Sequence, residues 1–353
     1  MPLNSDNFIK SLVNEGYTHL CVVPCSFAKN VINSAINSNQ IEYVPAASEA
    51  VACSIAAGMK IAGLKPVVIV QSSGFTNMVS CITSLLKPYG IKFPIIVSWR
   101  TYNRGDSEIQ HKHLSTELPK LIKACGFDYE ILDKKNLKNS LMQINKGNFD
   151  HKLCLIESDT FNTSKLSENH RLILEKYIPR SNFLTSLNLY FKNKDVFFIG
   201  TTGNTSREMY TYMCDTKNFY MAGNMGGALS LGFGASKSGK KIIVCGGDAE
   251  FVMHMGGLSN CGRDAKSINL TYILFDNKQN KSTGGQNTYQ NHMNYIDIAK
   301  ANNFKVCEKI ISKLDEFQAE LEIPSGLKFI HVVCGLDDIT PRPPLSILKQ
   351  NSL

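Results

Sequence analysis

The feature that most constrains the fold is a short run of apolar, often β-branched residues that recurs along the chain. Four runs lie in the first half, at 19–23, 66–70, 94–97 and 153–156, and four in the second, at 196–199, 241–245, 270–275 and 329–333. Each run is too short for a helix and too continuous for a strand with one exposed face. The runs therefore predict parallel strands that are buried on both faces.

Helical patterns separate these runs, as in Phe8, Ile9, Leu12 and Val13 near the start. Alternation of strands and helices predicts an α/β fold with doubly wound parallel sheets. The polar stretch at 158–169 is the best candidate for a linker, and the alternation of helices and strands begins again after it with a helix at 181–191. We therefore expect two α/β domains of similar layout, at 1–165 and 166–353.

Composition narrows the class of protein. The net charge is +8, but the lysines are scattered and form no long run, which favours a solvated basic surface or small anionic substrates over nucleic acid. Several of the 11 cysteines lie inside apolar runs and the pattern contains no CxxC hairpin, which favours a reduced, cytoplasmic protein. The first residues lack an apolar signal region and no stretch approaches 18 apolar residues, so we expect no membrane contact.

The stretch GGDAEFVMHMGG at 246–257 places one acid, Asp248, directly after two glycines and the run at 241–245. Ligands of open α/β sheets bind beyond the carboxyl ends of the strands, which is where Asp248 falls. Gly246 and Gly247 let the backbone turn tightly and approach a ligand. We expect a helix to start near Glu250, with free N–H groups that favour an anion. A phosphate group that carries a divalent cation would satisfy both the amides and the carboxylate.

A second polar residue accompanies Asp248. Asn277 follows the next predicted strand and lies 277 − 248 = 29 residues further on, an interval that fits one helix and one strand. Both residues should leave the same sheet edge side by side. A carboxylate, an amide oxygen and a backbone carbonyl are ligands suited to Mg²⁺. The alternative is that Asp248 caps a helix and Asn277 forms a turn.

At this point the sequence resembles a known family. Gly247-Asp248-Ala249 followed by Asp276-Asn277 is similar to the GDG…NN signature of thiamine diphosphate enzymes. The longer text at 246–289 resembles the decarboxylases of that family that act on phosphonopyruvate and, next, sulfopyruvate. The resemblance continues through segments in both halves, at 23–26, 47–50, 71–74, 108–111, 201–208 and 223–226.

The resemblance implies thiamine diphosphate and Mg²⁺ as cofactors. It implies a pyrimidine-binding domain at 1–165 and a diphosphate-binding domain at 166–353, with no middle domain. It also implies a homodimer or homotetramer with active sites at the subunit interface. The implied reaction is decarboxylation of a three-carbon 2-oxo acid with an anionic tail, most simply 3-phosphonopyruvate to phosphonoacetaldehyde and CO₂.

The matching residues receive roles in the same way. Glu49 corresponds to the glutamate that hydrogen-bonds the aminopyrimidine ring of the cofactor, and its small, mostly apolar neighbours suit a carboxyl group that shares a proton. An ordinary first-turn helix acid is the alternative for Glu49. The metal ligands are Asp248, Asn277 and the carbonyl of Gln279. Cofactor contacts are expected from Ser73, Gly74, Thr202, Gly203, Gly223, Met225, Gly247, Asp248, Ala249, Glu250, Asn277 and Gln279.

Three positions depart from the family pattern. Cys25 stands where Asp is usual, Asn204 where Lys is usual, and Gly227 where His is usual. None of them changes the expected cofactor residues, so the cofactor site should be intact while the substrate and the outcome stay open.

Candidates for substrate contact are Cys25, Ser26, Lys29, His111 and Arg207, with Arg100 as a further cation for the tail. The alternatives are a sulfopyruvate decarboxylase, a carboligase that hands the intermediate to an acceptor, and a non-catalytic cofactor-binding or partner subunit.

Overall fold

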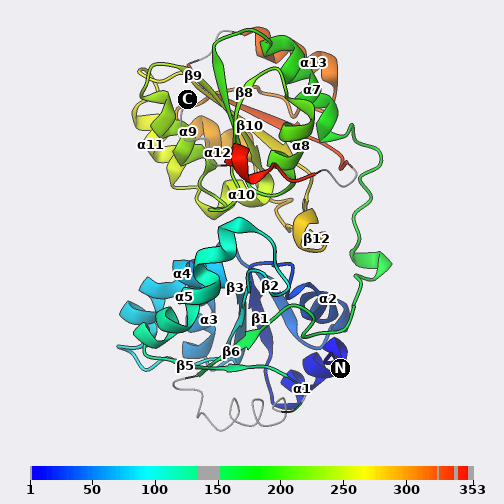
Figure 1. The fold of residues 1–353 in the computed structure, drawn as a ribbon, viewed down its shortest axis with the longest axis vertical. Coiled ribbons are helices and arrows are strands. Elements are labelled where there is room, and N and C mark those ends of the chain that lie inside the picture. Colours follow the sequence, from blue (N-terminus) through cyan, green and yellow to red (C-terminus); the bar gives the residue numbers. More distant parts are fainter. Residues whose placement is uncertain (1, 134, 136–151, 324–325, 338–340, 349–353) are drawn as a thin grey trace. The chain divides into compact units, whose positions relative to one another are not determined.

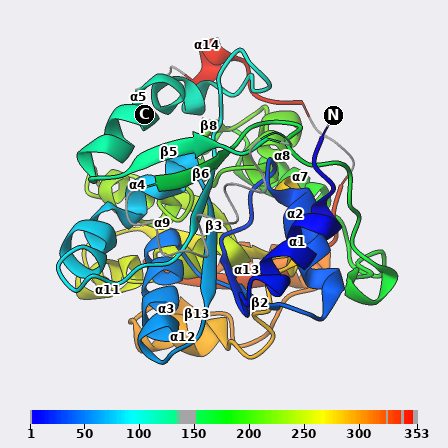
Figure 2. The same ribbon diagram turned by 90° about the horizontal axis from the view of Figure 1, so that it is seen from below.

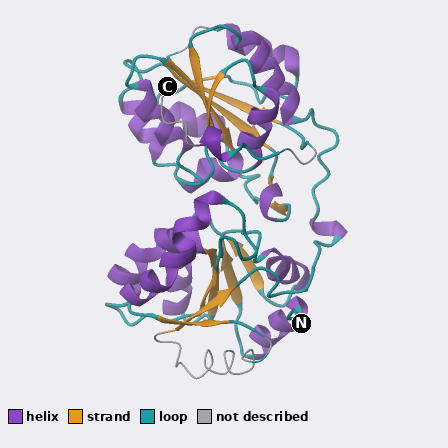
Figure 3. Ribbon diagram, viewed as in Figure 1, coloured by secondary structure: helices purple, strands orange, loops and turns teal. Residues whose placement is uncertain are grey.

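A computed structural model of the chain describes residues 2–133, 135, 152–323, 326–337 and 341–348. It divides into two compact units (Figure 1). The first contains Met1–Arg171 and Asn280–Asn287, and the second contains Leu172–Gln279 and Thr288–Leu353. Each unit is a six-stranded parallel sheet with helices on both faces, as Figure 3 shows, so the predicted α/β fold is confirmed.

The sheet of the first unit has the strand order β2-β1-β3-β4-β6-β5. Every neighbouring pair is parallel. The strands are β1 (His19–Val22), β2 (Glu42–Pro45), β3 (Pro66–Gln71), β4 (Ile95–Ser98), β5 (Asp128–Ile131) and β6 (Lys152–Ile156).

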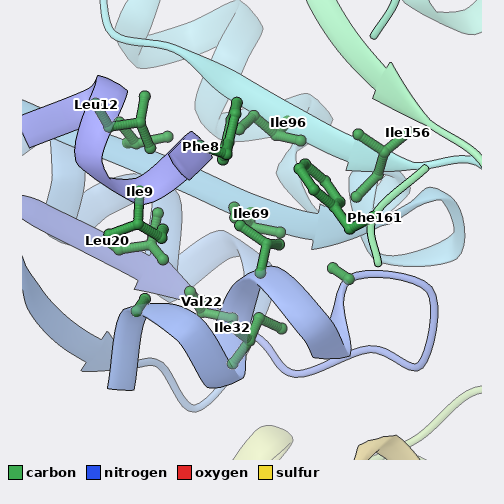
Figure 4. Packing of buried hydrophobic residues seen from close by; sticks show 14 of the residues in the cluster. Phe8, Ile9, Leu12, Leu20, Val22, Ile32, Ile69, Ile96, Ile156 and Phe161 are labelled. Atoms are coloured by element: carbon green, nitrogen blue, oxygen red, sulfur yellow. The ribbon is translucent and has the colours of Figure 1, made fainter. Parts of the chain in front are cut away.

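Helices cover both faces of this sheet, which Figures 1 and 2 show from two directions. On one face lie α1 (Ser5–Asn14) and α2 (Lys29–Ser38), and on the other lie α3 (Glu49–Ile61), α4 (Ser72–Cys81) and α5 (Lys112–Ala124). A π-helix, η1 (Ile82–Leu86), continues α4, and η2 (Ile109–His111) and η4 (Glu168–His170) are short 3-10 helices. Phe8 and Leu12 of α1 and Ile32 of α2 pack on Ile69 and Ile96 of the sheet (Figure 4). This apolar contact holds α1 and α2 against the sheet.

The sheet of the second unit has the order β13-β14-β10-β9-β7-β8, again with parallel neighbours. Its strands are β7 (Val196–Gly200), β8 (Lys217–Tyr220), β9 (Lys241–Gly247), β10 (Leu270–Asp276), β13 (Lys305–Val306) and β14 (Leu327–Val333). One face packs on α9 (Ala228–Ser236), α10 (Asp248–Met253), α11 (Gly257–Arg263) and α12 (Tyr295–Ala301). The other packs on α7 (Arg180–Phe191), α8 (Asn204–Tyr212) and α13 (Leu314–Glu322). A short helix, α14 (Leu345–Leu348), comes after the last strand.

The two sheets have one topology. Numbered from the first strand of each unit, both read 2-1-3-4-6-5. All eight apolar runs are strands of these sheets, while four edge strands, β2, β5, β8 and β13, were not expected. Their residues are half-buried or exposed, so their sequences lack a continuous apolar run.

The polar stretch at 158–169 is held on the first unit. Asn30 and Asn33 of α2 donate side-chain hydrogen bonds to the carbonyls of Phe161 and Ser164, at 3.3 and 2.9 Å. Asn162 in turn accepts from the N–H of Ser5 at 2.9 Å. The expected linker is therefore ordered by side-chain amides, and the division between the units lies after Arg171.

The segment Asn280–Asn287 also belongs to the first unit, although its flanks belong to the second. It contains η5 (Lys281–Thr283) and the strand β12 (Gln286–Asn287), which pairs with β11 (Gln279–Asn280). Gln286 is fully buried, and its Nε2 donates to Asn33 Oδ1 at 2.8 Å. Over the residues that the structure describes, no helix is long and apolar enough to cross a membrane.

Candidate functional site

Two loops of the second unit leave its sheet at neighbouring positions. β9 and β10 pair in parallel with Gly247 opposite Phe275. Asp248 follows β9 directly and Asn277 follows β10 directly, so both leave the same edge of the sheet. Both are buried, with 4% and 6% of their surface exposed. The fold thus brings the two predicted metal ligands to one corner of the unit.

Thr288 links these two loops. Its hydroxyl donates to Asp248 Oδ2 at 3.0 Å, and its backbone N–H donates to the carbonyl of Lys278 at 3.0 Å. Because Lys278 lies between Asn277 and Gln279, Thr288 connects Asp248 to the loop that carries the other two predicted ligands. The sequence carries no signal for Thr288, which lies 40 residues from Asp248.

The electrostatics of this corner favour a cation. Burial, followed by the neighbouring Asp276 carboxylate, raises the pKa of Asp248 to about 7. Asp276 accepts a hydrogen bond from the N–H of Lys278 at 3.0 Å, and its other oxygen lies 3.1 Å from His331 Nε2. Two buried acids repel each other when both are ionised, and a divalent cation beside Asp248 would offset that repulsion.

The available donors are of the hard, oxygen type. Asn277 Oδ1 accepts from the N–H of Gln279 at 3.1 Å and keeps a second lone pair. Across the described ranges, no group of three His, Cys, Asp or Glu residues could hold a metal ion. A carboxylate, an amide oxygen and a backbone carbonyl therefore fit Mg²⁺ better than they fit zinc.

The two glycines before Asp248 differ in what surrounds them. A Cβ on Gly246 would lie 1.9 Å from the Tyr272 hydroxyl oxygen, whereas a Cβ on Gly247 would meet no atom within 4 Å. Gly246 is thus required by packing, and Gly247 leaves open space beside Asp248. The helix α10 begins at Asp248, two residues earlier than expected, because the preceding strand continues through Gly247.

Glu250, an expected cofactor residue, has both carboxylate oxygens engaged inside the unit. One accepts from the Tyr272 hydroxyl, and the other accepts from the N–H of Ala228 at 3.3 Å. Burial raises the pKa of Glu250 to about 7. The structure therefore shows Glu250 holding the start of α9, while Ala249 lies half-buried beside it in α10.

The loop before α9 carries Gly223 and Met225, both partly exposed. Gly226 has φ +91°, and a Cβ there would lie 2.9 Å from His254 Cγ. A Cβ on Gly227 would lie 2.3 Å from Asn224 Nδ2. A side chain at 227, one of the three departures, would require the exposed Asn224 side chain to move.

The loop after β7 contains Thr202 and Gly203, and α8 begins at Asn204. Gly203 has φ +79°, which favours glycine. The neighbouring Thr201 is 3% exposed, and its Oγ1 has no hydrogen-bond partner in the described part of the chain. A buried hydroxyl without a partner is unusual, and an oxygen of a bound diphosphate would satisfy it.

In the first unit, Glu49 is the first residue of α3 and only 6% exposed. Its Oε2 accepts from Asn77 Nδ2 at 2.9 Å. A Cβ on Gly74 would lie 2.0 Å from Glu49 Oε1, so the carboxylate occupies the space that a side chain would take. Ser73 accepts from Gln71 Nε2 at 2.7 Å. Predicted residues 49, 73 and 74 thus lie together, and Asn77 is an addition that sequence reasoning missed.

A second polar cluster of the first unit surrounds Arg100, which is 5% exposed. Its Nε donates to Asp106 Oδ2 at 2.7 Å, its Nη1 donates to Ser26, and its Nη2 lies 3.9 Å from Glu108 Oε1. The guanidinium carbon lies 4.2 Å from the centroid of the Phe27 ring. Two carboxylates therefore already face the charge of Arg100, the further candidate cation for a substrate tail.

His111 is held by the same carboxylate. Its Nδ1 lies 2.6 Å from Asp106 Oδ2, and its Nε2 lies 3.3 Å from Gln71 Nε2. Burial, and then the charge of Arg100, lower the pKa of His111, against the opposing effect of Asp106. Burial opposes ionisation of Asp106, but the hydrogen bond from Arg100 outweighs it and lowers the pKa to about 2. The carboxylate therefore faces a neutral imidazole, which donates from Nδ1 and accepts at Nε2.

The remaining substrate candidates are separated. Cys25 is buried and its Sγ lies 3.1 Å from Ser98 Oγ, and burial raises the pKa of this thiol. Lys29 is exposed at the start of α2. Arg207 belongs to α8 in the second unit. Of these candidates, the structure groups only Cys25 and Ser26 with the Arg100 cluster.

Comparisons with known proteins bear on both units. The N-terminal thiamine pyrophosphate-binding domain of thiamine pyrophosphate enzymes matches residues 4–119, and the C-terminal thiamine pyrophosphate-binding domain matches residues 200–322. The chain belongs to the thiamine pyrophosphate enzymes, as its sequence predicted.

Within that family it is similar to three curated relatives along most of its length. It is 26% identical to the phosphonopyruvate decarboxylase of Streptomyces viridochromogenes, covering 90% of this chain and 84% of the relative. It is 26% identical to the phosphonopyruvate decarboxylase of Streptomyces hygroscopicus, covering 96% and 83%. It is 26% identical to the sulfopyruvate decarboxylase of Methanosarcina acetivorans, covering 93% and 90%.

Proposed function

We propose that this enzyme is a Mg²⁺- and thiamine diphosphate-dependent decarboxylase of a three-carbon 2-oxo acid with an anionic tail. The proposed reaction converts 3-phosphonopyruvate to phosphonoacetaldehyde and CO₂. The observation that carries the proposal is Glu49, a buried carboxylate for which Gly74 leaves room and to which Asn77 donates. The match to both cofactor-binding domains supports it.

The second unit has the residues to hold the diphosphate and its metal. Asp248, Asn277 and the carbonyl of Gln279 would hold Mg²⁺, and the open space beside Gly247 admits a phosphate group. The unpartnered hydroxyl of Thr201 offers a further donor next to Thr202 and Gly203. Gly223 and Met225 remain the proposed contacts of the aminopyrimidine and of the bent cofactor.

Thiamine diphosphate, when bound, supplies a carbanion that attacks the keto group of the substrate and then takes up its electrons. Glu49 would hold and exchange a proton with the aminopyrimidine ring through its carboxylate. Burial of Glu49 keeps bulk water from competing for that proton. His111 is oriented by Asp106 and offers Nε2 as a site that accepts and returns a proton.

The anionic tail needs groups that can still donate. Because Asp106 and Glu108 balance Arg100, we assign the tail to the Ser26 hydroxyl, which accepts from Arg100 and keeps its own proton, and to Lys29 at the start of α2. Cys25, another of the three departures, places a neutral thiol beside Ser98 where Asp is usual in the family. This change removes a charge near the substrate, and it is the observation that favours a carboligase as the second candidate.

Sulfopyruvate is the alternative decarboxylation substrate, because the relative named for it is as similar as those named for phosphonopyruvate. The proposed assembly is a homodimer or homotetramer with active sites shared between subunits, in the cytoplasm.

The test is CO₂ release from phosphonopyruvate, sulfopyruvate and pyruvate, with and without an acceptor aldehyde. Glu49→Gln should lower kcat by about 100-fold or more, the usual contribution of a positioned proton-transfer group. Glu42→Gln is the matched control, because that side chain is 68% exposed in the same unit. An unchanged rate for Glu49→Gln contradicts the mechanism, and a ligated product without free aldehyde supports the carboligase.

A further inference from the structure

We infer that Asn77 is a positioning residue that holds the Glu49 carboxylate in its working orientation. The inference rests on the proposed function, because it concerns the residue to which proton exchange is assigned there. It adds a residue, on a different helix, through which that function can be altered.

The geometry comes from two helices that begin at one edge of the first sheet. α3 follows β2 and starts at Glu49, and α4 follows β3 and starts at Ser72. Gly74 and Asn77 are three residues apart on α4 and so lie on one face of that helix. That face meets Glu49, since Asn77 donates to Oε2 at 2.9 Å and the position of a Gly74 Cβ is 2.0 Å from Oε1.

This arrangement gives the two carboxylate oxygens different tasks. Oε2 is fixed by an amide that can only donate, and Oε1 lies over bare helix backbone. In the described ranges, Asn77 is the one residue seen to donate to this carboxylate through its side chain. Oε1 is therefore the oxygen that remains available to a ligand, and the hydrogen bond from the Asn77 amide fixes the orientation of the carboxylate plane.

A competing explanation is that Asn77 only joins α3 to α4. Removal of its side chain distinguishes the two roles. Loss of a structural tie changes the stability of the unit, whereas loss of a positioning residue changes the place of Glu49 and acts on proton exchange only through Glu49.

The experiment uses the full chain with Asn77→Ala and Asn77→Asp. Asn30→Ala is the control, because Asn30 is also a partly buried amide of the first unit, but it bonds Phe161 and Ser164 and lies on α2, on the other face of the sheet from α3. Crystal structures without cofactor report the orientation of Glu49. Hydrogen–deuterium exchange at C2 of bound thiamine diphosphate, with Mg²⁺ and without substrate, reports proton transfer separately from turnover.

In Asn77→Ala we expect the Glu49 carboxylate to leave its place over Gly74, and C2 exchange to slow by about 10- to 100-fold, the loss of one hydrogen bond to a charged group. Glu49→Gln combined with Asn77→Ala should be no slower than Glu49→Gln alone, because Asn77 acts through Glu49. Asn77→Asp opposes two carboxylates, so its exchange should recover as the pH falls and one acid is protonated. Asn30→Ala should leave exchange unchanged.

An unmoved Glu49 in Asn77→Ala, or additive losses in the double variant, overturns the inference. If the wild-type protein takes up no thiamine diphosphate in calorimetry, the proposed function fails, and the crystal structures still decide whether Asn77 positions Glu49.

Discussion

The substitution Gly74→Ala tests the candidate site at its tightest point. The new Cβ would lie 2.0 Å from Glu49 Oε1, 2.3 Å from its Cδ and 2.5 Å from its Cγ. Since carbon atoms of this kind are not found closer than 3.0 Å to such a neighbour, the carboxylate must retreat by about 1 Å. The bond from Asn77 is lost with that movement.

The magnitude follows from two opposing effects. A hydrogen bond to a charged group contributes about 1.5–3 kcal/mol. Replacing glycine by alanine inside a helix stabilises the helix by about 1 kcal/mol, which offsets part of that loss. The free energy of unfolding should therefore fall by only about 0.5–2 kcal/mol. A displacement of about 1 Å in a proton-transfer group, in contrast, lowers kcat/KM by roughly 100-fold.

The assay is CO₂ release together with thermal unfolding. Gly58→Ala is the control, because Gly58 lies in α3 and a Cβ there meets no atom within 4 Å. It should match wild type in rate and gain slightly in stability. If Gly74→Ala keeps more than about a third of wild-type kcat/KM, the Glu49 carboxylate does not work from its place over Gly74.

Three further outcomes are expected. Asp248→Asn should raise the Mg²⁺ concentration needed for half-maximal thiamine diphosphate binding by about 10-fold or more, since it removes the one charged ligand; calorimetry at several Mg²⁺ concentrations checks this. His111→Gln should make the free energy of unfolding depend less on pH below 6.5. The pKa of His111 is lowered in the folded state, so the neutral imidazole contributes stability that wild type loses as the pH falls below the ordinary pKa of 6.5; denaturant unfolding at several pH values measures the difference. In wild type, Arg180 donates two hydrogen bonds of 2.6 and 2.7 Å to the Glu208 carboxylate, and Glu208→Ala leaves this buried guanidinium unpaired. Its free energy of unfolding, measured with denaturant, should fall by about 3 kcal/mol or more, whereas Asp195→Ala, at an exposed ion pair, should change little.

The sequence predicted the strands at the centre of each sheet because burial on both faces leaves a continuous apolar run, as in 66–70 and 270–275. It did not predict β2 (Glu42–Pro45) or β8 (Lys217–Tyr220), because an edge strand is exposed on part of its surface and reads like a loop. The stretch at 158–169 has the composition of a linker, and only the spatial ladder of Asn30, Asn33 and Asn37 shows why it is ordered.

For the site, spacing predicted that Asp248 and Asn277 share a sheet edge, since strand and helix lengths are regular. Thr288 and Asn77 could not be found in this way, because each acts on a residue that is distant in the chain. The candidate cation Arg100 is paired with Asp106 and lies near Glu108, and both acids follow it closely in sequence and offered a signal for that pairing. The roles of Glu49 and of the metal ligands stay predictions until the variants are measured.

The shared strand order of the two sheets has a further consequence. The loops that follow the second and third strands occupy equivalent places in both copies. In one copy they present Glu49 and Gly74, and in the other Gly223 and Asp248. Proton exchange is thereby assigned to the loop after the second strand in one half, and charge neutralisation to the loop after the third strand in the other. Variation that retunes the first chemistry can accumulate in one half of the gene while the other half, and the second chemistry, stays as it is.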